Sequence, residues 1–302
     1  MAVKEGTQKK DILVSFSGGE TSAYMMNWLL LNRPNYNYKF IFANTGEENE
    51  ETLSFVDQCA KHFGVEVIWL EYERLSYKVV DFKTAYRSHD PVEIKNKWKN
   101  HPFRDYISTF GIPNRQNMSC TRELKEETIR RYMSANCWKP SKYDIAIGIR
   151  SDEIDRIGKH YYPLILPDIT KPIVNAFWDK MPFRLNLKGY QGNCKTCWKK
   201  SFRKLVTIAR ETPEKFDFFR QMEIDYDQYV KPEKDQEKID VPVRFFRESK
   251  SVDDIFEMAK NPKIQNAIDD SVNTNYQISV LHDGTELDAF NDCEESCDAF
   301  SK

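Results

Sequence analysis

The chain has 302 residues, of which 40% are hydrophobic and 13% aromatic, which is typical of a globular protein with a full-sized core and excludes a largely disordered chain. Its 45 basic and 47 acidic residues leave a net charge of −2, which excludes the general basic excess of proteins that bind nucleic acid over a wide surface. Residues 1–10 are charged and no run of 18 apolar residues occurs, so we expect a cytoplasmic protein with neither signal peptide nor membrane contact.

In the first half of the chain, apolar runs alternate with amphipathic segments, as in βαβ units. The apolar runs predict buried parallel strands at 11–15, 38–43, 65–70 and 143–149. Helical spacing predicts helices at 21–32, 49–63 and 122–134. Cys59 falls on the apolar face of the second helix, where we expect it to belong to the core, and Gly64 ends that helix. The pattern predicts an α/β fold with a Rossmann-like parallel sheet.

The remaining segments do not follow this alternation. Residues 76–112 are rich in aromatic and basic side chains and are broken by prolines, which predicts an irregular insertion over the carboxyl edge of the sheet. Beyond residue 200 we expect helices at 202–210, 214–229 and 252–258. We therefore divide the chain into a nucleotide-binding α/β domain, 1–200, and a mainly helical C-terminal extension with a cysteine tail, 201–302.

A glycine-rich loop lies between the first predicted strand and the first predicted helix. Its candidate ligand-binding residues are Ser15, Ser17, Gly18, Gly19, Thr21 and Ser22. Two glycines allow successive backbone N–H groups to converge on an anion, and the start of the helix adds a partial positive charge. An ordinary tight turn with a hydroxyl helix cap would explain any one of these residues. The order of strand, double glycine, hydroxyl cluster and helix favours a phosphate-binding loop.

Four short motifs carry a resemblance to a known family. They are Ser17 to Ser22, Phe42 to Glu48, Ile147 to Arg156, and the Cys-x-x-Cys at 194–197. In this order they resemble the pyrophosphate loop (PP-loop) and later motifs of the phosphoadenosine-phosphosulfate (PAPS) reductase branch of the adenine-nucleotide alpha-hydrolase superfamily. The resemblance covers residues 11 to about 200. It implies a PP-loop type of sheet and an adenine nucleotide, ATP or adenylyl sulfate, as the bound small molecule.

The resemblance also adds residues to the expected nucleotide site. Asn44, Thr45 and Gly46 stand in the turn that ends the second strand of that family. Arg150 and Arg156 follow a buried strand, where their planar guanidinium groups suit phosphate or sulfate oxygens. Ion pairs with neighbouring acidic residues are the alternative role for both arginines.

One residue departs from the family pattern. Many relatives carry a basic residue after the two glycines, where this chain has Glu20. A carboxylate directed at a triphosphate would be repelled. Either Glu20 turns outward in the first turn of the helix, which the helix dipole favours, or ATP is not the ligand.

Three cysteines are candidate metal ligands. Cys194 and Cys197 form a Cys-x-x-Cys in a glycine-containing loop, and Cys120 precedes Cys194 with 73 residues between them. This spacing resembles the iron–sulfur sulfonucleotide reductases, with Ser119 in place of one cysteine of a pair. The resemblance implies a 4Fe-4S cluster, and a structural zinc ion is the alternative for the same thiolates. A disulfide framework is not expected of the seven cysteines, because the cytoplasm keeps thiols reduced.

The other cysteines are candidates for a fourth ligand or for catalysis. Cys293 and Cys297 lie in an acidic tail, where a mobile thiol pair could act as the nucleophile. Cys137 follows a predicted helix, and we expect it to be mostly a core residue. Arg122 and Lys125 follow Cys120 closely enough to add positive charge near the thiols, although both could equally be solvated.

Two classes of function follow from these residues. In the first, the protein is a PP-loop oxidoreductase or an ATP-dependent sulfurtransferase, with a thiol reductant or a sulfur donor as partner. In the second, it binds a nucleotide without turnover and holds a structural zinc. A basic and aromatic run from Lys195 to Lys204 leaves a local nucleic-acid contact, such as with tRNA, as a further option.

Overall fold

The fold is a mixed α/β sheet with helices on both faces, and a computed structural model describes residues 9–88, 98–192, 194–229, 242–269, 271 and 299–300. Within these residues the sheet has five strands in the order β4-β3-β2-β1-β5. Its members are β1 (Asp11–Ser15), β2 (Asn37–Asn44), β3 (Val67–Glu73), β4 (Ser76–Val80) and β5 (Tyr143–Ala146). All neighbouring pairs are parallel except β3 and β4, which confirms the Rossmann-like parallel sheet.

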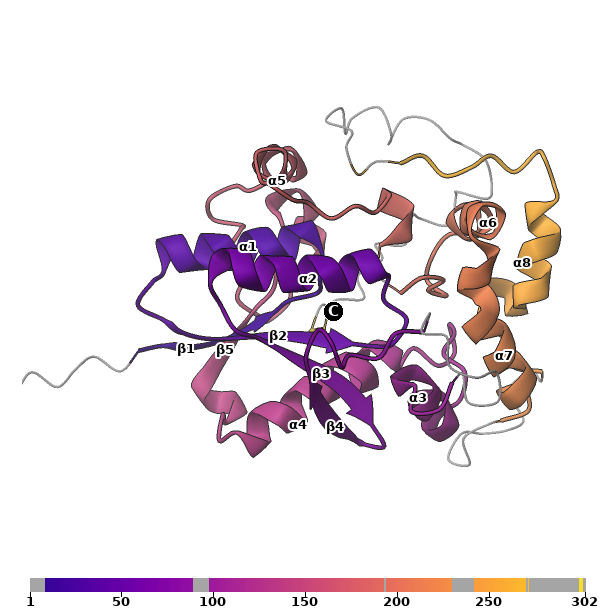
Figure 1. Cartoon of the computed structure of the whole chain (residues 1–302), viewed down its shortest axis with the longest axis horizontal. Coiled ribbons are helices and arrows are strands. Elements are labelled where there is room, and N and C mark those ends of the chain that lie inside the picture. The colour runs from indigo at the N-terminus through magenta and orange to yellow at the C-terminus, as the bar shows by residue number, and fades with distance from the viewer. Residues whose placement is uncertain are drawn as a thin grey trace, which may run out of the picture.

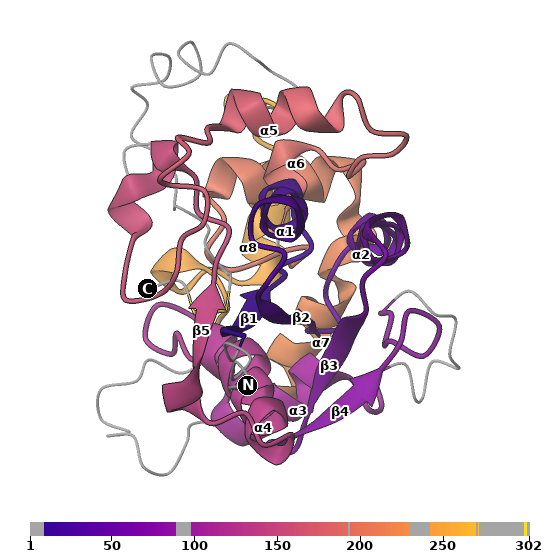
Figure 2. The same ribbon diagram turned by 90° about the vertical axis from the view of Figure 1, so that its left-hand side faces the viewer.

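Helices cover both faces of the sheet (Figures 1 and 2). One face carries α1 (Glu20–Asn32) and α2 (Glu50–Phe63), with α5 (Lys171–Trp178) packed on α1. The other face carries α4 (Thr128–Ala135), which continues a π-helical turn (Arg122–Glu127), and α3 (Pro102–Phe110) lies beside it. The extension contributes α6 (Phe202–Glu211), α7 (Asp217–Tyr226) and α8 (Val252–Ala259), which lie together beyond one end of the sheet.

Alternate side chains of the strands enter different parts of the core. In β1, Ile12 and Val14 pack with the α1 and α2 side, whereas Leu13 packs with the α4 side, and all three are fully buried. A parallel sheet covered on both faces needs such continuous apolar strands. A third hydrophobic cluster joins α3 to the C-terminal helices and contains Cys120, Cys194 and Cys197. This cluster includes residues on both sides of position 200, and the domain boundary placed there stays a prediction.

The segment 76–112, predicted to be irregular, contains β4 and α3. The β3–β4 hairpin turns at Arg74 and Leu75, which both adopt positive φ angles of 42° and 63°. Glycine or asparagine normally marks such a turn, so the sequence carries no signal for it. In α3, the imidazole of His101 accepts a hydrogen bond from the N–H of Phe103, and Pro102 occupies the first turn of the helix. The sequence analysis treats Pro102 as a break, but proline is favourable in the first turn of a helix.

Two cysteine expectations have definite outcomes. Cys59 is fully buried in α2, as predicted. The expectation for Cys137 is wrong: this residue is exposed, with φ 64°, because it lies in the turn after α4 has ended. Cys293 and Cys297 lie outside the described residues. None of the helices described here is long and apolar enough to cross a membrane.

The end of the chain is attached to the sheet. Ala299 and Phe300 are both buried. The backbone N–H of Phe300 donates to the Glu126 carboxylate (3.2 Å), and the Ser15 hydroxyl donates to the carbonyl of Ala299 (3.5 Å). The Arg130 guanidinium lies 5.0 Å from the centre of the Phe300 ring. Ala299 and Phe300 therefore lie near the end of β1, where the glycine-rich loop begins.

A buried carboxyl group holds the C-terminal helices together. Glu223 in α7 accepts hydrogen bonds from the backbone N–H groups of Phe245 (3.1 Å) and Val252 (2.9 Å), the latter at the start of α8. Burial raises the pKa of Glu223 to about 7, even though both hydrogen bonds favour the ionised form.

This raised pKa predicts a pH dependence of stability. A carboxyl group with a higher pKa in the folded than in the unfolded chain contributes stability that is complete below its unfolded pKa and is lost as the pH rises through the folded value. Between pH 5 and 8 the free energy of unfolding should fall by about 2 kcal/mol more in the wild type than in Glu223→Gln. Denaturant titrations of both proteins at these pH values measure the difference. Equal pH slopes would show that Glu223 does not titrate in this way.

Candidate functional site

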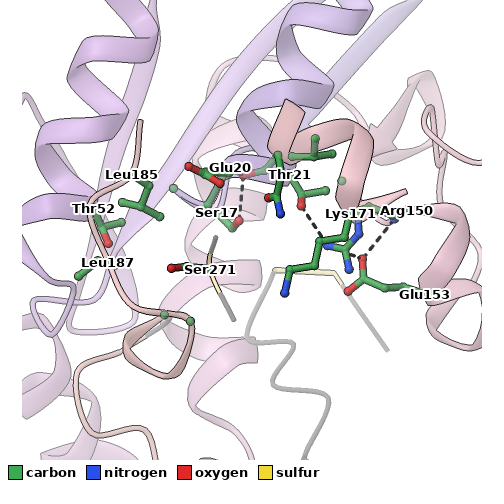
Figure 3. Close-up of a pocket in the computed structure, with 18 of the residues that line it drawn as sticks. Ser17, Glu20, Thr21, Thr52, Arg150, Glu153, Lys171, Leu185, Leu187 and Ser271 are labelled. Carbon is green, nitrogen blue, oxygen red and sulfur yellow. Dashed lines mark hydrogen bonds and ion pairs between the residues drawn. The ribbon is translucent and has the colours of Figure 1, made fainter. Parts of the chain in front are cut away.

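A pocket of about 330 Å³ lies at the carboxyl edge of the sheet, over the glycine-rich loop (Figure 3). From the loop itself it takes Ser17, Gly18, Gly19, Glu20, Thr21 and Ser22. The other lining residues come from α2, the segment after β5, α5 and the chain leading to the cysteine loop, and include Glu48, Thr52, Gly148, Arg150, Glu153, Arg156, Lys171, Val174, Asn175, Leu185, Leu187, Lys188, Gly189 and Gly192. This volume suits a nucleotide-sized ligand.

The two glycines of the loop have different roles. Gly18 has φ +82°, and a Cβ atom there would lie 2.6 Å from Cγ2 of Thr52, so both the backbone angle and the space require glycine. Gly19 caps α1 with ordinary extended angles of φ −94° and ψ 158°, and a Cβ atom would meet only Ser17 Oγ, at 3.6 Å. The expectation of special backbone angles is therefore right for Gly18 and wrong for Gly19. The Ser22 hydroxyl donates to the Gly19 carbonyl (2.8 Å) and lies 2.9 Å from the Ser17 hydroxyl.

Glu20 does not face the pocket as an unpaired charge. The Arg184 guanidinium donates through Nε to Oε1 and through a terminal nitrogen to Oε2, both at 3.0 Å. Burial raises the pKa of Glu20, and the hydrogen bonds and charge of Arg184 oppose this shift. The indole N–H of Trp178 also donates to the Glu20 carbonyl (3.0 Å). Glu20 therefore lines the pocket as one half of an ion pair with Arg184, and this neighbouring cation reduces the repulsion of an anionic ligand.

The two predicted arginines lie at the pocket and also form ion pairs. Arg150 donates to the Thr21 hydroxyl (3.1 Å) and to Asp152 (2.9 Å), and it lies 3.2 Å from a Glu153 oxygen. Arg156 pairs with the other oxygen of Glu153. The ion pairs considered as the alternative role are thus present, and contact with a ligand stays a prediction. The hydrogen bond to Thr21 holds Arg150 against the loop.

The pocket is chemically divided along its length. In Figure 3, Leu185, Leu187 and Thr52 lie on one side of the loop, and Arg150, Lys171 and Glu153 lie on the other. Val174 adds a further buried apolar side chain. One end therefore offers an apolar wall, and the other offers positive charge.

Four of the residues expected at the nucleotide lie elsewhere. Ser15 is buried against Ala299. Asn44 donates to Glu71 (2.7 Å) and to the Tyr86 carbonyl (3.0 Å). Thr45 faces the cysteines, and Gly46 lies against His101, whose ring would be 2.7 Å from a Cβ atom. Glu48 of the same turn and Thr52 of the following helix α2 do line the pocket.

The three predicted metal ligands line one buried cavity. Cys120, Cys194 and Cys197 share this space of about 20 Å³ with Thr45, Lys125, Trp198 and the side chains of Phe103, Thr121, Leu124 and Phe219. All three thiols are buried. The fold therefore brings together Cys120 and Cys194, which have 73 residues between them in the sequence.

Buried lysines surround these cysteines. Lys125 lines the cavity and lies 3.6 Å from Glu48. Lys195, within the Cys-x-x-Cys, donates to the Ser88 hydroxyl, and Lys200 donates to the carbonyls of Tyr190 (3.1 Å) and Gly192. Burying ammonium groups is costly unless anions are near. Positive charge at this position favours thiolates over thiols. Arg122, by contrast, is mostly exposed and pairs with Glu123.

The burial of this segment also bears on nucleic-acid binding. Lys195, Trp198 and Lys200 are all buried. Their ammonium and indole groups therefore add nothing to an exposed basic and aromatic surface. Lys199, Arg203 and Lys204 of the same run are only partly buried, and a local nucleic-acid contact stays a prediction.

The three thiols are chemically suited to bind a metal, but the space between them is small. Three thiols with nearby cations suit thiolate-binding metals. Among the described residues, however, no three Cys, His, Asp or Glu side chains are placed so that they could hold a metal ion directly. A cavity of about 20 Å³ holds roughly one water-sized particle. At this size the cavity is closer to the volume of a single ion than to that of a four-iron cluster.

The pocket and the cysteine cavity share a wall. Glu48 lines the pocket, and its Oε1 accepts a hydrogen bond from Thr45 (3.1 Å), which lines the cavity. The Thr45 hydroxyl lies 3.5 Å from the Cys194 sulfur. In addition, the side chain of Asn49 donates to the backbone carbonyl of Gln191 (2.9 Å). Gln191 is followed by Gly192, which lines the pocket, and then by the cysteine loop.

A second buried pair supports this wall. The His101 ring accepts the Phe103 N–H at Nδ1 (3.1 Å), so its proton lies on Nε2, which donates to Glu47 (3.0 Å). Burial lowers the pKa of His101, which keeps the ring neutral. The Glu47 carbonyl in turn accepts the N–H of Lys195 (2.9 Å). The turn after β2 is thus fixed to both the cysteine loop and α3.

Several lining residues were missed by the sequence analysis. Lys171 and Asn175 lie in a segment without a recognised motif, and their position depends on how α5 packs on α1. Arg184 does not line the pocket itself but pairs with Glu20, which does. Gly148 had a weak signal, since a glycine after a buried strand often marks a close approach. A Cβ atom there would lie 2.9 Å from Cα of Ser22.

A pair of alanine substitutions tests the geometry of the loop. Gly18→Ala should destabilise the protein by about 1–3 kcal/mol, because its positive φ and the Thr52 contact both oppose a Cβ atom. Gly19→Ala should change the free energy of unfolding by less than about 0.5 kcal/mol. Thermal and denaturant unfolding of both variants measures this. Equal effects would contradict the loop conformation.

A charge exchange tests the Glu20–Arg184 pair. Glu20→Lys should destabilise the protein by about 1–3 kcal/mol, because it places two cations together in a half-buried position. Adding Arg184→Glu should restore part of the loss, and a double-mutant cycle from denaturant unfolding measures the coupling. Additive effects would show that the two side chains do not interact. A fully stable Glu20→Lys protein would contradict the same pairing.

Comparison with known proteins agrees with this geometry. Residues 11–159 match the family described as phosphoadenosine phosphosulfate reductase domain. The chain is 29% identical over 205 residues to an uncharacterised nin-region protein of Escherichia phage lambda. This match covers 66% of this chain and 69% of the phage protein. It is 27% identical over 128 residues to an uncharacterised protein of Methanocaldococcus jannaschii, with 42% of this chain but only 21% of that protein covered. Residues 11–159 thus belong to the phosphoadenosine phosphosulfate reductase domain family.

Proposed function

We propose that the protein is a PAPS reductase-like enzyme that binds an adenine nucleotide, ATP or adenylyl sulfate, and uses cysteine chemistry on it. The reaction would be sulfonucleotide reduction or sulfur transfer, with an iron–sulfur cluster at Cys120, Cys194 and Cys197. The observation that carries this proposal is the shared wall: Glu48, at the nucleotide pocket, is hydrogen-bonded to Thr45, which touches Cys194.

The pocket supports nucleotide binding at both of its ends. The loop offers backbone N–H groups and the start of α1 to a phosphate. The apolar wall of Leu185 and Leu187 suits a base, and the opposite end carries Arg150 and Lys171. A nucleotide in the pocket would therefore lie across the loop, with its base and its anionic group on opposite sides.

The tail cysteines are the proposed nucleophiles for reduction. In that reaction a thiolate of Cys293 or Cys297 forms a bond to the sulfonate sulfur of adenylyl sulfate. The bond from sulfur to the phosphate oxygen breaks, and AMP leaves with its electron pair. A thiol reductant then forms a disulfide with that cysteine and releases sulfite. The attachment of Ala299 next to Ser15 supports this role, because it fixes the chain end beside the loop.

Sulfur transfer uses the same pocket differently. ATP would adenylate a carbonyl oxygen of an acceptor, and pyrophosphate would leave. Sulfide from the sulfur donor would then attack the activated carbon, and AMP would leave with the oxygen and its electron pair. Release of pyrophosphate from ATP or of sulfite from adenylyl sulfate distinguishes the two reactions. A tRNA would be one acceptor for sulfur transfer, the reaction that releases pyrophosphate.

The zinc alternative has one observation in its favour. The cysteine cavity, at about 20 Å³, accommodates a single ion more readily than a cluster. In that case the cysteines would hold a structural ion, and the protein would bind a nucleotide without turnover. Metal analysis separates this alternative from the proposed enzyme.

The nucleotide proposal predicts the effect of Gly19→Val. Because Gly19 has ordinary backbone angles, valine should leave the fold intact and place its side chain in the anion's space. Calorimetric titration should show binding of ATP or adenylyl sulfate to the wild type and at least roughly tenfold weaker binding to the variant. Unchanged affinity would contradict binding at this loop.

The cysteine proposal predicts a matched set of serine variants. In protein purified without oxygen, Cys120→Ser, Cys194→Ser and Cys197→Ser should each lower bound iron, whereas Cys59→Ser and Cys137→Ser should not. Visible absorbance with iron, sulfide and zinc analysis measures the outcome. Stoichiometric zinc in a colourless protein would favour the structural alternative.

The tail is better tested by point variants than by truncation. Removing the end of the chain would also remove the buried Phe300 and disturb the fold. Cys293→Ser and Cys297→Ser should keep nucleotide affinity, and loss of turnover in at least one of them is expected. Full turnover in the double variant would show that the tail thiols are dispensable.

A further inference from the structure

We propose that Lys171 and Asn175 of α5 bind the terminal anionic group of the nucleotide, beyond the phosphate held by the loop. This inference rests on the proposed nucleotide binding and adds a specificity site to it. Helix α5 lies outside residues 11–159, the part of the chain that matches the family. Its contribution to the pocket is therefore a property of this chain that the family match does not supply.

Asn175 is a hydrogen-bond donor that lacks an acceptor. Its side chain lines the pocket, the residue is only 5% exposed, and among the described residues its amide nitrogen Nδ2 has no hydrogen-bond partner. Leaving a buried donor unsatisfied costs about 1–3 kcal/mol. An acceptor atom on a ligand in the pocket would remove this cost.

Lys171 lies one helical turn before Asn175. Residues four apart share a face of a helix, and both side chains line the same pocket. Figure 3 shows Lys171 beside Arg150 and Thr21, on the side of the loop opposite Leu185 and Leu187. The packing of α5 on α1 fixes this face against the loop, with Trp178 bonded to the Glu20 carbonyl as its anchor.

The charge at this end identifies the ligand chemistry. An ammonium group, a guanidinium group and an amide donor on one side of the loop suit a tetrahedral oxyanion such as a phosphate or sulfate. The base fits the apolar wall on the other side. The oxyanion is therefore the group attached beyond the 5′-phosphate: the sulfate of adenylyl sulfate, or the β- and γ-phosphates of ATP.

Helix α5 also supplies the cation that the loop lacks. At position 20 the side chain is a carboxylate occupied by Arg184, so the loop itself gives no positive side chain to the ligand. Lys171 brings an ammonium group to the pocket from a different element. Glu20, which departs from the family pattern, and Lys171 of α5 then form one consistent arrangement.

Ligands that differ only in the terminal group test this proposal. AMP, adenylyl sulfate and ATP are titrated calorimetrically into the wild type, Lys171→Gln, Asn175→Leu and Asn175→Asp. Lys180→Gln is the matched control, because it removes the same charge from an exposed position just after α5. AMP binding reports in each variant whether the loop is still folded.

We expect Lys171→Gln and Asn175→Leu to weaken ATP and adenylyl sulfate by roughly tenfold or more, which is the loss of a hydrogen bond to a charged group. Their AMP affinity should stay within about twofold of the wild type, and Asn175→Asp should lose most of its ATP affinity through repulsion. A larger loss for ATP than for adenylyl sulfate, or the reverse, identifies which oxyanion the site prefers.

Two results would overturn the proposal. Equal loss of AMP and ATP affinity in Lys171→Gln would show that α5 contacts another part of the nucleotide or only supports the fold. If Lys171→Gln and Asn175→Leu both bound every ligand within about twofold of the wild-type affinity, α5 would not bind the terminal anionic group. Absence of binding by the wild type is a different outcome, because it would overturn the proposed function itself.

Discussion

Each of three loops at the carboxyl edge of the sheet has a glycine where a Cβ atom would clash with a neighbouring helix or its cap. A Cβ atom would lie 2.6 Å from Thr52 at Gly18, 2.7 Å from His101 at Gly46, and 2.9 Å from Ser22 at Gly148. These contacts hold the ends of β1, β2 and β5 against α2, the start of α3 and α1, respectively. The nucleotide pocket and the cysteine cavity lie on the two sides of this junction, which is why a change in the turn after β2 can be felt by both.

Charge is distributed around the junction in pairs. On the pocket side Glu20 is matched by Arg184, and Glu153 is matched by Arg150 and Arg156. On the cysteine side Glu48 is matched by Lys125, and Lys195 and Lys200 use hydroxyl and carbonyl acceptors. Lys125 lines the cavity together with the three thiols, and a cation close to a thiol favours its thiolate form. An anionic ligand in the pocket would likewise lie close to Arg150 and Lys171.

Periodic apolar residues predicted much of the fold, because the buried strands and the amphipathic helices of the first half have strong patterns. The positive-φ turn at Arg74 and Leu75 and the imidazole cap of α3 carry no usual signal, and so β4 and α3 were missed. At the site, motif residues such as Gly18, Thr21 and Arg150 could be predicted because their chemistry is local to short segments. Lys171, Asn175 and Arg184 could not, because tertiary packing of α5 and the following chain on α1 decides their position. Tertiary packing also decides the position of Thr45. The motif predicted that Thr45 contacts the nucleotide, whereas in the structure it lies beside Cys194.

The central claim is that one adenine nucleotide lies across the loop, next to the cysteines. A crystal structure of the protein, prepared without oxygen and bound to a non-hydrolysable ATP analogue, tests it most directly. The account predicts electron density for a phosphate over Gly19, for the base against Leu185 and Leu187, and for the terminal phosphates between Arg150 and α5. Density for the analogue elsewhere on the protein, with the loop pocket empty, would contradict it.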